Sequence, residues 1–299
     1  MQIEHNKITW KNMANPGAGD LNFLDEELGV SQIVLKDLLG FNKRPKIEEF
    51  DTYLFLVIHF PVFNEKTRQT TPTEIDFIIT QNLVLTVYQH ENPRLVNLFK
   101  ELENNEARRP ECFRNAGWLL FYILDKMIDS CLPMLDHIHE KIDAIEEKVF
   151  DGREKEMLKE IAIVKRDIID FRRTIKPQRS VLELLSRKMA RFSKEDLEII
   201  SQEVVGSEIR VWNTLENHKE MIEAIEQTNS NLLSFQINQV MHTLTFFSIV
   251  LFSLTFIAGF FSMRAMEAIK NPLGLLGIGL LMITTVIFIT VVFKNKRWL

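Results

Sequence analysis

Two long apolar stretches near the C-terminus, residues 244–263 and 273–293, dominate the hydropathy pattern of the chain. Each contains about twenty residues and no charged side chain, which is the length that a helix needs to cross the hydrocarbon core of a bilayer. Because lipid offers no hydrogen-bond partners, a backbone within it must satisfy its own polar groups. We therefore predict two transmembrane helices, joined by a link at 264–272 and followed by a basic tail at 294–299.

The first part of the chain contains strand-like segments. Residues 8–13, 53–60 and 74–88 are rich in the aromatic and β-branched side chains that are typical of strands. The sequence Gln81-Asn82 predicts a turn within the last of them. These segments indicate a sheet.

A helix is predicted between the first two of these segments. Apolar residues recur at helical spacing over 21–39, with Asp20 as the expected N-cap and Gly40 as the expected end. Together with the strands, this helix predicts an α/β domain at residues 1–115.

From Asn115 onward the pattern is almost entirely helical. Apolar residues advance by threes and fours as in a long amphipathic helix, and Pro133 should bend it. This stripe consists of Leu120, Leu124, Met127, Cys131, Met134, Ile138, Ile142, Ile145 and Val149. Asp151-Gly152 should then turn the chain. We predict a region of long helices at 116–192.

Two further helices are expected after that turn. One runs from Glu154 towards Arg191, with a kink at Pro177. The next begins near Ser193, where Asp196 completes a capping box. It has no clear breaker before the membrane, so we predict a stalk helix at 193–263, on the order of 100 Å long, that continues into the first span.

The topology follows from the ends of the chain. No short apolar segment with a positive start opens the sequence, so we expect no signal peptide and a cytoplasmic N-terminal region. With two spans, the C-terminus returns to the same side. Lys294, Lys296 and Arg297 directly after the second span agree with this, although Arg264 and Lys270 in the link weaken the charge rule.

Composition narrows the class of function. The net charge of −5 argues against nucleic acid as a partner. The sequence contains no Gly-rich phosphate loop, no nucleophile elbow and no spaced Cys/His set. We therefore expect neither enzymatic activity nor a bound cofactor.

One face of the stalk and first span carries small and polar residues at alternating steps of three and four. This row, which we call the seam, consists of Asn238, Met241, Thr245, Ser248, Phe252, Thr255, Gly259 and Ser262. Such residues either allow close helix packing or line a water-filled path. The seam extends into the stalk as Asn238, beyond the lipid, which favours a pore. Because two spans cannot enclose a pore, that interpretation requires a ring of identical subunits.

Six segments of the chain carry a shared resemblance: RPKIEEFDTYLFLVIHF, EIDFIITQNLVLTVY, LPMLDHIHEKIDAIEEKVF, IIDFRRTIKPQRSVLELL, NQVMHTLTFFSIVLFSLTFIAGFF and the terminal KRWL. Through them the chain resembles the CorA magnesium-transporter family over nearly its whole length. The first two are similar to the family's α/β segment, the next two to its long helices, and the last two to its pore helix and tail. The resemblance implies an α+β cytoplasmic domain with long helices, two transmembrane helices and a homopentameric funnel. It places pore-facing positions at Asn238, Leu244, Ser248, Phe252, Thr255 and Gly259.

The outer mouth departs from the family pattern. Where the family has Gly-Met-Asn, this chain has Ser262-Met263-Arg264. Mg²⁺ needs oxygen acceptors around its water shell, whereas arginine offers only donors. A ring of arginines is associated with anion selectivity, although pairing with Glu267 would neutralise the mouth.

The position that matches the family's sensor for cytoplasmic divalent ions also departs from the family pattern. The family senses these ions with carboxylates between subunits, one of them on the stalk helix. The matching position here is Gln227, with Glu226 beside it. Glutamine is a weak ligand for Mg²⁺.

His137 and His139 lie among acidic residues, but two positions apart on a helix point to different sides. His139 can share a face with Asp136, Glu140 and Asp143, and a solvated charged face is favoured over a metal site.

The leading hypothesis is a pentameric channel in the inner membrane, crossed twice by each subunit with both termini cytoplasmic. Its expected cargo is a divalent metal cation, Mg²⁺ by resemblance or Co²⁺, Ni²⁺ or Zn²⁺, with selectivity altered by Arg264. One rival is a pentamer that conducts anions or nothing. The other is a membrane-anchored scaffold or sensor that acts through its cytoplasmic domain.

Overall fold

The computed structural model describes the chain except for residues 43, 65–68, 190–196, 263–271 and 297–299. The chain divides into two compact units. The first, which we call the sheet unit, comprises Met1–Asp151 and Glu156–Ile225. The second, the two-helix unit, comprises Gly152–Lys155 and Glu226–Leu299.

A six-stranded sheet with the order β1-β2-β6-β5-β4-β3 forms the centre of the sheet unit. β2 and β6 are parallel, and the other neighbours are antiparallel. The strands are β1 (Gln2–His5), β2 (Ile8–Ala14), β3 (Lys46–Glu49), β4 (Leu54–Asn64), β5 (Gln69–Ile79) and β6 (Leu83–Tyr88). The three predicted strand segments and the turn at Gln81-Asn82 are confirmed.

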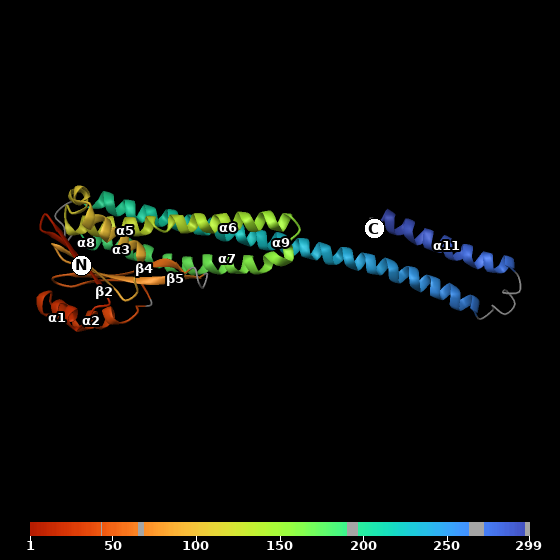
Figure 1. Cartoon of the computed structure of the whole chain (residues 1–299), viewed down its shortest axis with the longest axis horizontal. Coiled ribbons are helices and arrows are strands. Elements are labelled where there is room, and N and C mark those ends of the chain that lie inside the picture. Colours follow the sequence, from red (N-terminus) through yellow and green to blue (C-terminus); the bar gives the residue numbers. More distant parts are fainter. Residues whose placement is uncertain (43, 65–68, 190–196, 263–271, 297–299) are drawn as a thin grey trace. The chain divides into compact units, whose positions relative to one another are not determined.

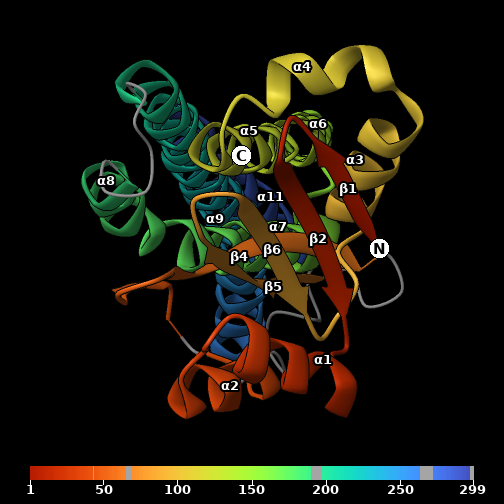
Figure 2. The same cartoon turned by 90° about the vertical axis from the view of Figure 1, so that its left-hand side faces the viewer.

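Helices cover both faces of this sheet. Figure 2 shows α1 (Ala18–Asn22) and α2 (Gln32–Leu39) on one face, and α3 (Pro93–Asn104) and α5 (Ala116–Asp129) on the other. β4 is consequently buried on both faces and reads as a continuous apolar run rather than an alternating one.

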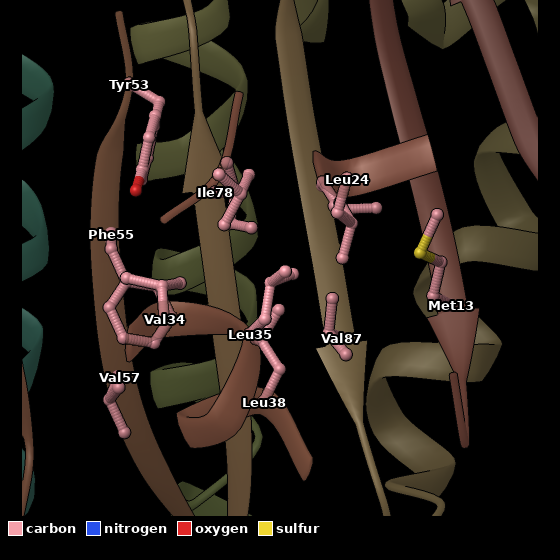
Figure 3. Close-up of a cluster of buried hydrophobic side chains, with 12 residues drawn as sticks. Met13, Leu24, Val34, Leu35, Leu38, Tyr53, Phe55, Val57, Ile78 and Val87 are labelled. Atoms are coloured by element: carbon pink, nitrogen blue, oxygen red, sulfur yellow. The ribbon is translucent and has the colours of Figure 1, made fainter. Parts of the chain in front are cut away.

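A hydrophobic cluster joins α2 to the sheet (Figure 3). Val34, Leu35 and Leu38 of α2 point towards Phe55 and the other buried side chains of the strands. The sheet contributes Met13, Phe55, Val57, Ile78, Leu85 and Val87 to the cluster, and Tyr53 directly before β4 joins them. This packing fixes the position of α2 and of the chain that follows it.

The predicted helix at 21–39, with Asp20 as its N-cap, is wrong. The segment forms α1, a π-helical turn η1 (Phe23–Glu27) and α2, with Gly29 at a φ of 60° between them. The Ser31 hydroxyl, not Asp20, caps α2 by accepting from the Val34 N–H. A left-handed glycine interrupts the ladder although the apolar spacing continues through it. The expected end at Gly40 is confirmed.

The long helices are more divided than predicted. The stripe from Leu120 to Val149 forms α5 and α6 (Leu132–Phe150), so Pro133 lies in the first turn of a new helix rather than at a bend. The expected turn at Asp151-Gly152 is confirmed, with Gly152 at a φ of 82°.

The predicted continuous helix from Glu154 is also divided at its proline. α7 (Glu154–Ile175) ends before Pro177, and α8 (Gln178–Met189) begins after it. No helix was predicted between β6 and Asn115. That region contains α3, whose N-cap Asn92 accepts from two backbone N–H groups, together with η2 (Glu106–Arg108) and α4 (Arg109–Cys112).

The C-terminal helices are α9 (Glu198–Ser262) and α11 (Pro272–Asn295), shown in Figure 1. α9 begins later than predicted, because Leu197 is not helical; the expected cap residues Ser193 and Asp196 lie outside the described residues. Both helices are long and apolar enough to cross a membrane. In their most apolar windows, 0% of α9 and 11% of α11 is buried, unlike the core helix of a soluble protein.

Candidate pore-lining surface

The seam is an exposed face of α9. Phe252 is 81% exposed, Met241 is 54% exposed and, beside the seam, Leu244 is 59% exposed. Asn238, Ser248, Thr255, Gly259 and Ser262 are exposed as well, and only Thr245 is half-buried. The structure therefore places all the described seam residues on one helix face that contacts little else in the two-helix unit.

A different row of α9 side chains faces α11. The half-buried members of this row are His242, Phe246, Val250, Ser253, Ile257 and Phe261. Phe246 meets Phe293 of α11 edge to face, with ring centroids 5.4 Å apart. Ser253 and Ile257 line a shallow groove together with Thr285 of α11, and Phe252 of the seam and Phe256 border the same groove. Packing between the two helices thus does not use most of the seam.

Most of this α11-facing row was missed by sequence reasoning. Its members advance by steps of three and four, as the seam does, but they mix aromatic, aliphatic and polar types. The usable signals were Phe246 and Ile257, both of which lie opposite the seam by sequence spacing and suit lipid or the second helix.

Two hydroxyl groups of the seam donate hydrogen bonds to carbonyl groups of their own helix. The Thr245 hydroxyl donates to the Met241 carbonyl at 2.7 Å, and the Ser248 hydroxyl donates to the Leu244 carbonyl at 2.8 Å. A hydroxyl that donates to its own helix keeps its lone pairs as acceptors. These two oxygens are therefore suited to accept hydrogen bonds from the water shell of a cation.

The predicted outer mouth is only partly within the described residues. Ser262 is the last residue of α9 and is exposed. Met263, Arg264 and Glu267 lie outside the described residues.

The stalk position assigned to ion sensing carries an exposed amide. Gln227 lies on α9, and its side-chain N–H donates to the Asn231 side-chain oxygen at 3.1 Å. A neutral amide engaged along its own helix has less to offer a divalent cation than a carboxylate.

The histidines of α6 do not form a metal centre with the acidic residues around them. His137 pairs with Glu140 at 3.0 Å in an exposed position. His139 lies 3.7 Å from the Asp143 carboxylate and stacks on His218 of α9 with ring centroids 5.4 Å apart. Burial, together with the neighbouring His139, lowers the pKa of His218. Among the described residues, no three His, Cys, Asp or Glu side chains are placed to hold a metal ion.

Comparisons with known proteins agree with this architecture. A family model described as CorA-like Mg²⁺ transporter protein matches residues 5–297. The cobalt/magnesium transport protein CorA of Thermotoga maritima is 26% identical over 296 residues, which is 97% of this chain and 83% of that protein. The zinc transport protein ZntB of Pectobacterium atrosepticum is 19% identical over 299 residues, which is 99% of this chain and 90% of that protein.

The fold has a solved counterpart. The complete structure of the CorA magnesium transporter from Methanocaldococcus jannaschii matches with a TM-score of 0.85 at 21% identity, covering 100% of this chain and 94% of that one. The expected α+β domain with long helices, followed by two apolar helices, is thereby confirmed.

Proposed function

Since the chain belongs to the family of CorA-like Mg²⁺ transporter proteins, we propose that it forms a homopentameric channel for divalent metal cations. Membership confirms the family resemblance and the expectation of an ion transporter rather than an enzyme. The proposal adds three features to family membership: the pentameric assembly, the residues that line the pore, and the transported ion.

The exposed seam is the observation that carries the proposal. α9 packs on α11 through one row of side chains and leaves the small and polar side chains of the seam exposed. The seam is therefore a second surface of α9 that another molecule must contact. In a ring of subunits that surface faces the axis and lines the pore. The proposed lining is Asn238, Met241, Leu244, Thr245, Ser248, Phe252, Thr255 and Gly259, with Ser262, Met263, Arg264 and Glu267 at the mouth.

The proposed topology divides the chain by side of the membrane. We place residues 1–115 and 116–192 in the cytoplasm and 193–263 in the stalk and first span, which begins at 244. The link 264–272 is external, 273–293 is the second span, and the tail 294–299 returns to the cytoplasm. The membrane is the cell's inner membrane.

The cargo we propose is a hydrated divalent cation. The acceptor state of the Thr245 and Ser248 hydroxyls supports a cation that keeps its water shell. The related proteins are named for cobalt, magnesium and zinc transport, so Mg²⁺, Co²⁺, Ni²⁺ and Zn²⁺ are the candidates. We propose weaker preference for Mg²⁺ than in a channel with an asparagine mouth, because Arg264 removes an acceptor.

The deciding experiment is flux into liposomes that hold the purified full-length protein. Uptake of Mg²⁺, Co²⁺, Ni²⁺, Zn²⁺ and chloride is compared for the unmodified protein and Arg264→Asn. We expect divalent uptake without chloride uptake, and a several-fold higher Mg²⁺ flux in the variant, because five arginines at one mouth repel cations.

Two outcomes would favour the rivals. Chloride uptake that Arg264→Asn abolishes would identify an anion pore, which is the rival that the arginine itself favours. Absence of any flux from both proteins, with failure to rescue a strain deficient in magnesium uptake, would favour a scaffold or sensor.

A further inference from the structure

Two histidine rings pack on each other between α6 and α9 within the sheet unit. The rings of His139 and His218 are nearly parallel, with an angle of 15° between their planes and 5.4 Å between their centroids. Their surroundings differ, because His218 is 5% exposed whereas the side chain of His139 is 51% exposed. A half-exposed ring of α6 thus covers one face of a buried ring of α9.

The buried ring has no partner for a second N–H group. Nδ1 of His218 is buried and has no hydrogen-bond partner among the described residues. A protonated imidazole is a donor at both of its nitrogens. Protonation of His218 in this position leaves a donor of a charged ring buried without an acceptor, and such a group costs more than an unpaired neutral one.

Burial is the main influence on the titration of His218, and it lowers the pKa of the ring below the usual 6.5. A charge on His139 acts in the same direction, because two imidazolium rings repel each other. The Asp136 and Asp143 carboxylates of α6 act in the opposite direction. The neutral form of His218 is therefore favoured in the folded protein at neutral pH.

The charged residues that flank His218 on α9 are already paired. Glu216 pairs with Arg172 of α7, and Lys219 pairs with Glu223, with 3.7 Å between Nζ and Oε2. A carboxylate that is engaged with an arginine is less available to a protonated ring. The charged groups that act on His218 are therefore those of α6.

Separation of the two rings allows His218 to accept a proton. One proton from the solvent forms a second N–H bond on the ring, and no other bond breaks. While α6 stays in place, the new charge is buried beneath His139. Once the His139 ring moves away, water solvates the charge. Protonation therefore favours a state in which α6 and α9 are apart at this point.

We propose that the His139–His218 contact is a pH-sensitive contact between α6 and α9, closed while His218 is neutral and open when it is protonated. It responds to acidification of the compartment that contains the sheet unit. The proposal goes beyond the channel function, since it concerns packing within the sheet unit and involves no transported ion.

The contact weakens towards acid pH. The closed state, in which the pKa of His218 is lowered, binds the proton less readily than an open state with a solvated ring. The contribution of the contact is therefore fully present above about pH 6.5 and is lost as the pH falls below that value. The equilibrium shifts by up to about tenfold for each pH unit.

Hydrogen exchange of α6 measures the opening, because a helix that leaves its partner loses the packing that protects its backbone amides. Full-length protein in detergent is labelled in D₂O at about pH 7.5 and about pH 5.5, and peptides from Leu132–Phe150 are followed by mass spectrometry. His218→Phe keeps an aromatic ring for the stack but cannot bind a proton. Comparison with the wild type at the same pH cancels the intrinsic pH dependence of exchange.

We expect equal protection of α6 in the two proteins at the higher pH. At the lower pH, exchange of α6 should be up to about tenfold faster in the wild type than in His218→Phe. His218→Gln also removes the titrating ring, without adding apolar bulk, and should lack the acid response as well. His137→Phe is the matched control: it alters an exposed histidine of α6 that pairs with Glu140, and it should respond to acid as the wild type does.

Three results would overturn the proposal: no acid response of α6 in the wild type, the same response in both His218 variants, or loss of the response in His137→Phe. The last result would assign the response to an exposed histidine. Because no step involves transport, failure of this test leaves the channel proposal standing, and failure of the liposome flux experiment leaves the His139–His218 contact standing.

Discussion

The two compact units differ in how their large apolar side chains are shielded from water. In the sheet unit, Trp10, Phe55 and Phe77 are completely buried by other parts of the same unit. In the two-helix unit, Phe252 and Phe256 are 81% and 73% exposed. The first unit contains its own hydrophobic environment, whereas the second must receive one from lipid and from further copies of the chain.

This difference decides how many of the contacts of each unit can be derived from a single chain. For the sheet unit, one chain determines which residue meets which. For the two-helix unit, one chain determines the α9–α11 contact, and the exposure of the seam then indicates which surface remains for other molecules. The same residue type therefore has a different role in each unit.

A matched pair of phenylalanine variants should show this difference between the two units most clearly. Phe55→Ala should destabilise the protein by about 3–5 kcal/mol, because it leaves a cavity in a closed core. Phe252→Ala should leave denaturant unfolding of the sheet unit unchanged but alter cation flux in liposomes. Equal loss of stability in both variants would contradict the division into a closed and an open unit.

A smaller effect should come from a buried carboxyl group in the sheet unit. Glu208 of α9 is 3% exposed, and burial raises its pKa from 4.5 to about 7 although Arg179 opposes the shift. The folded protein holds this proton more tightly than the unfolded one, so stability is fully present below about pH 4.5 and falls as the pH rises through about 7.

The loss amounts to at most about 3.5 kcal/mol between these limits, since each pKa unit corresponds to about 1.4 kcal/mol. Denaturant unfolding at several pH values should show it, and Glu208→Gln should flatten the profile in this range. A variant with the same pH dependence as the wild type would show that water reaches this part of the interior.

The smallest predicted effect concerns the contact between α9 and α11 within the two-helix unit. Phe246→Ala should weaken the pairing of α9 with α11 by about 1 kcal/mol, because the edge-to-face contact with Phe293 is lost. Thermal unfolding in lipid nanodiscs measures the change. Leu251→Ala, at a position of the same helix that is 63% exposed and does not line the groove against α11, is the control and should have little effect.

Sequence reasoning was most successful where one physical signal dominates. Residues 244–263 and 273–293 are apolar for longer than a soluble helix tolerates, so both spanning helices were predictable. The strands were predictable because β-branched and aromatic runs such as 53–60 end at turn residues. Helical spacing, by contrast, does not report breaks: Gly29 and Pro177 each divide a helix whose apolar pattern continues.

The sequence predicted which residues share the seam face of α9, but it did not predict whether that face is exposed or packed. Spacing placed Ser248 and Thr255 on one face, yet it could not tell whether that face meets α11, because Phe246 and Ile257 follow the same period.

The continuity of α9 has a mechanical consequence. From Glu198 to Ser262 no residue leaves the helix, so the rod that begins in the sheet unit has no joint before it enters the apolar segment. Neighbouring residues on a helix are about 100° apart, so the bulky ring of Phe252 and the small side chain of Ser253 face different directions around its axis. In the proposed pore, the side chain that borders the ion path would therefore depend on the rotation of α9 as well as on its distance from the pore axis.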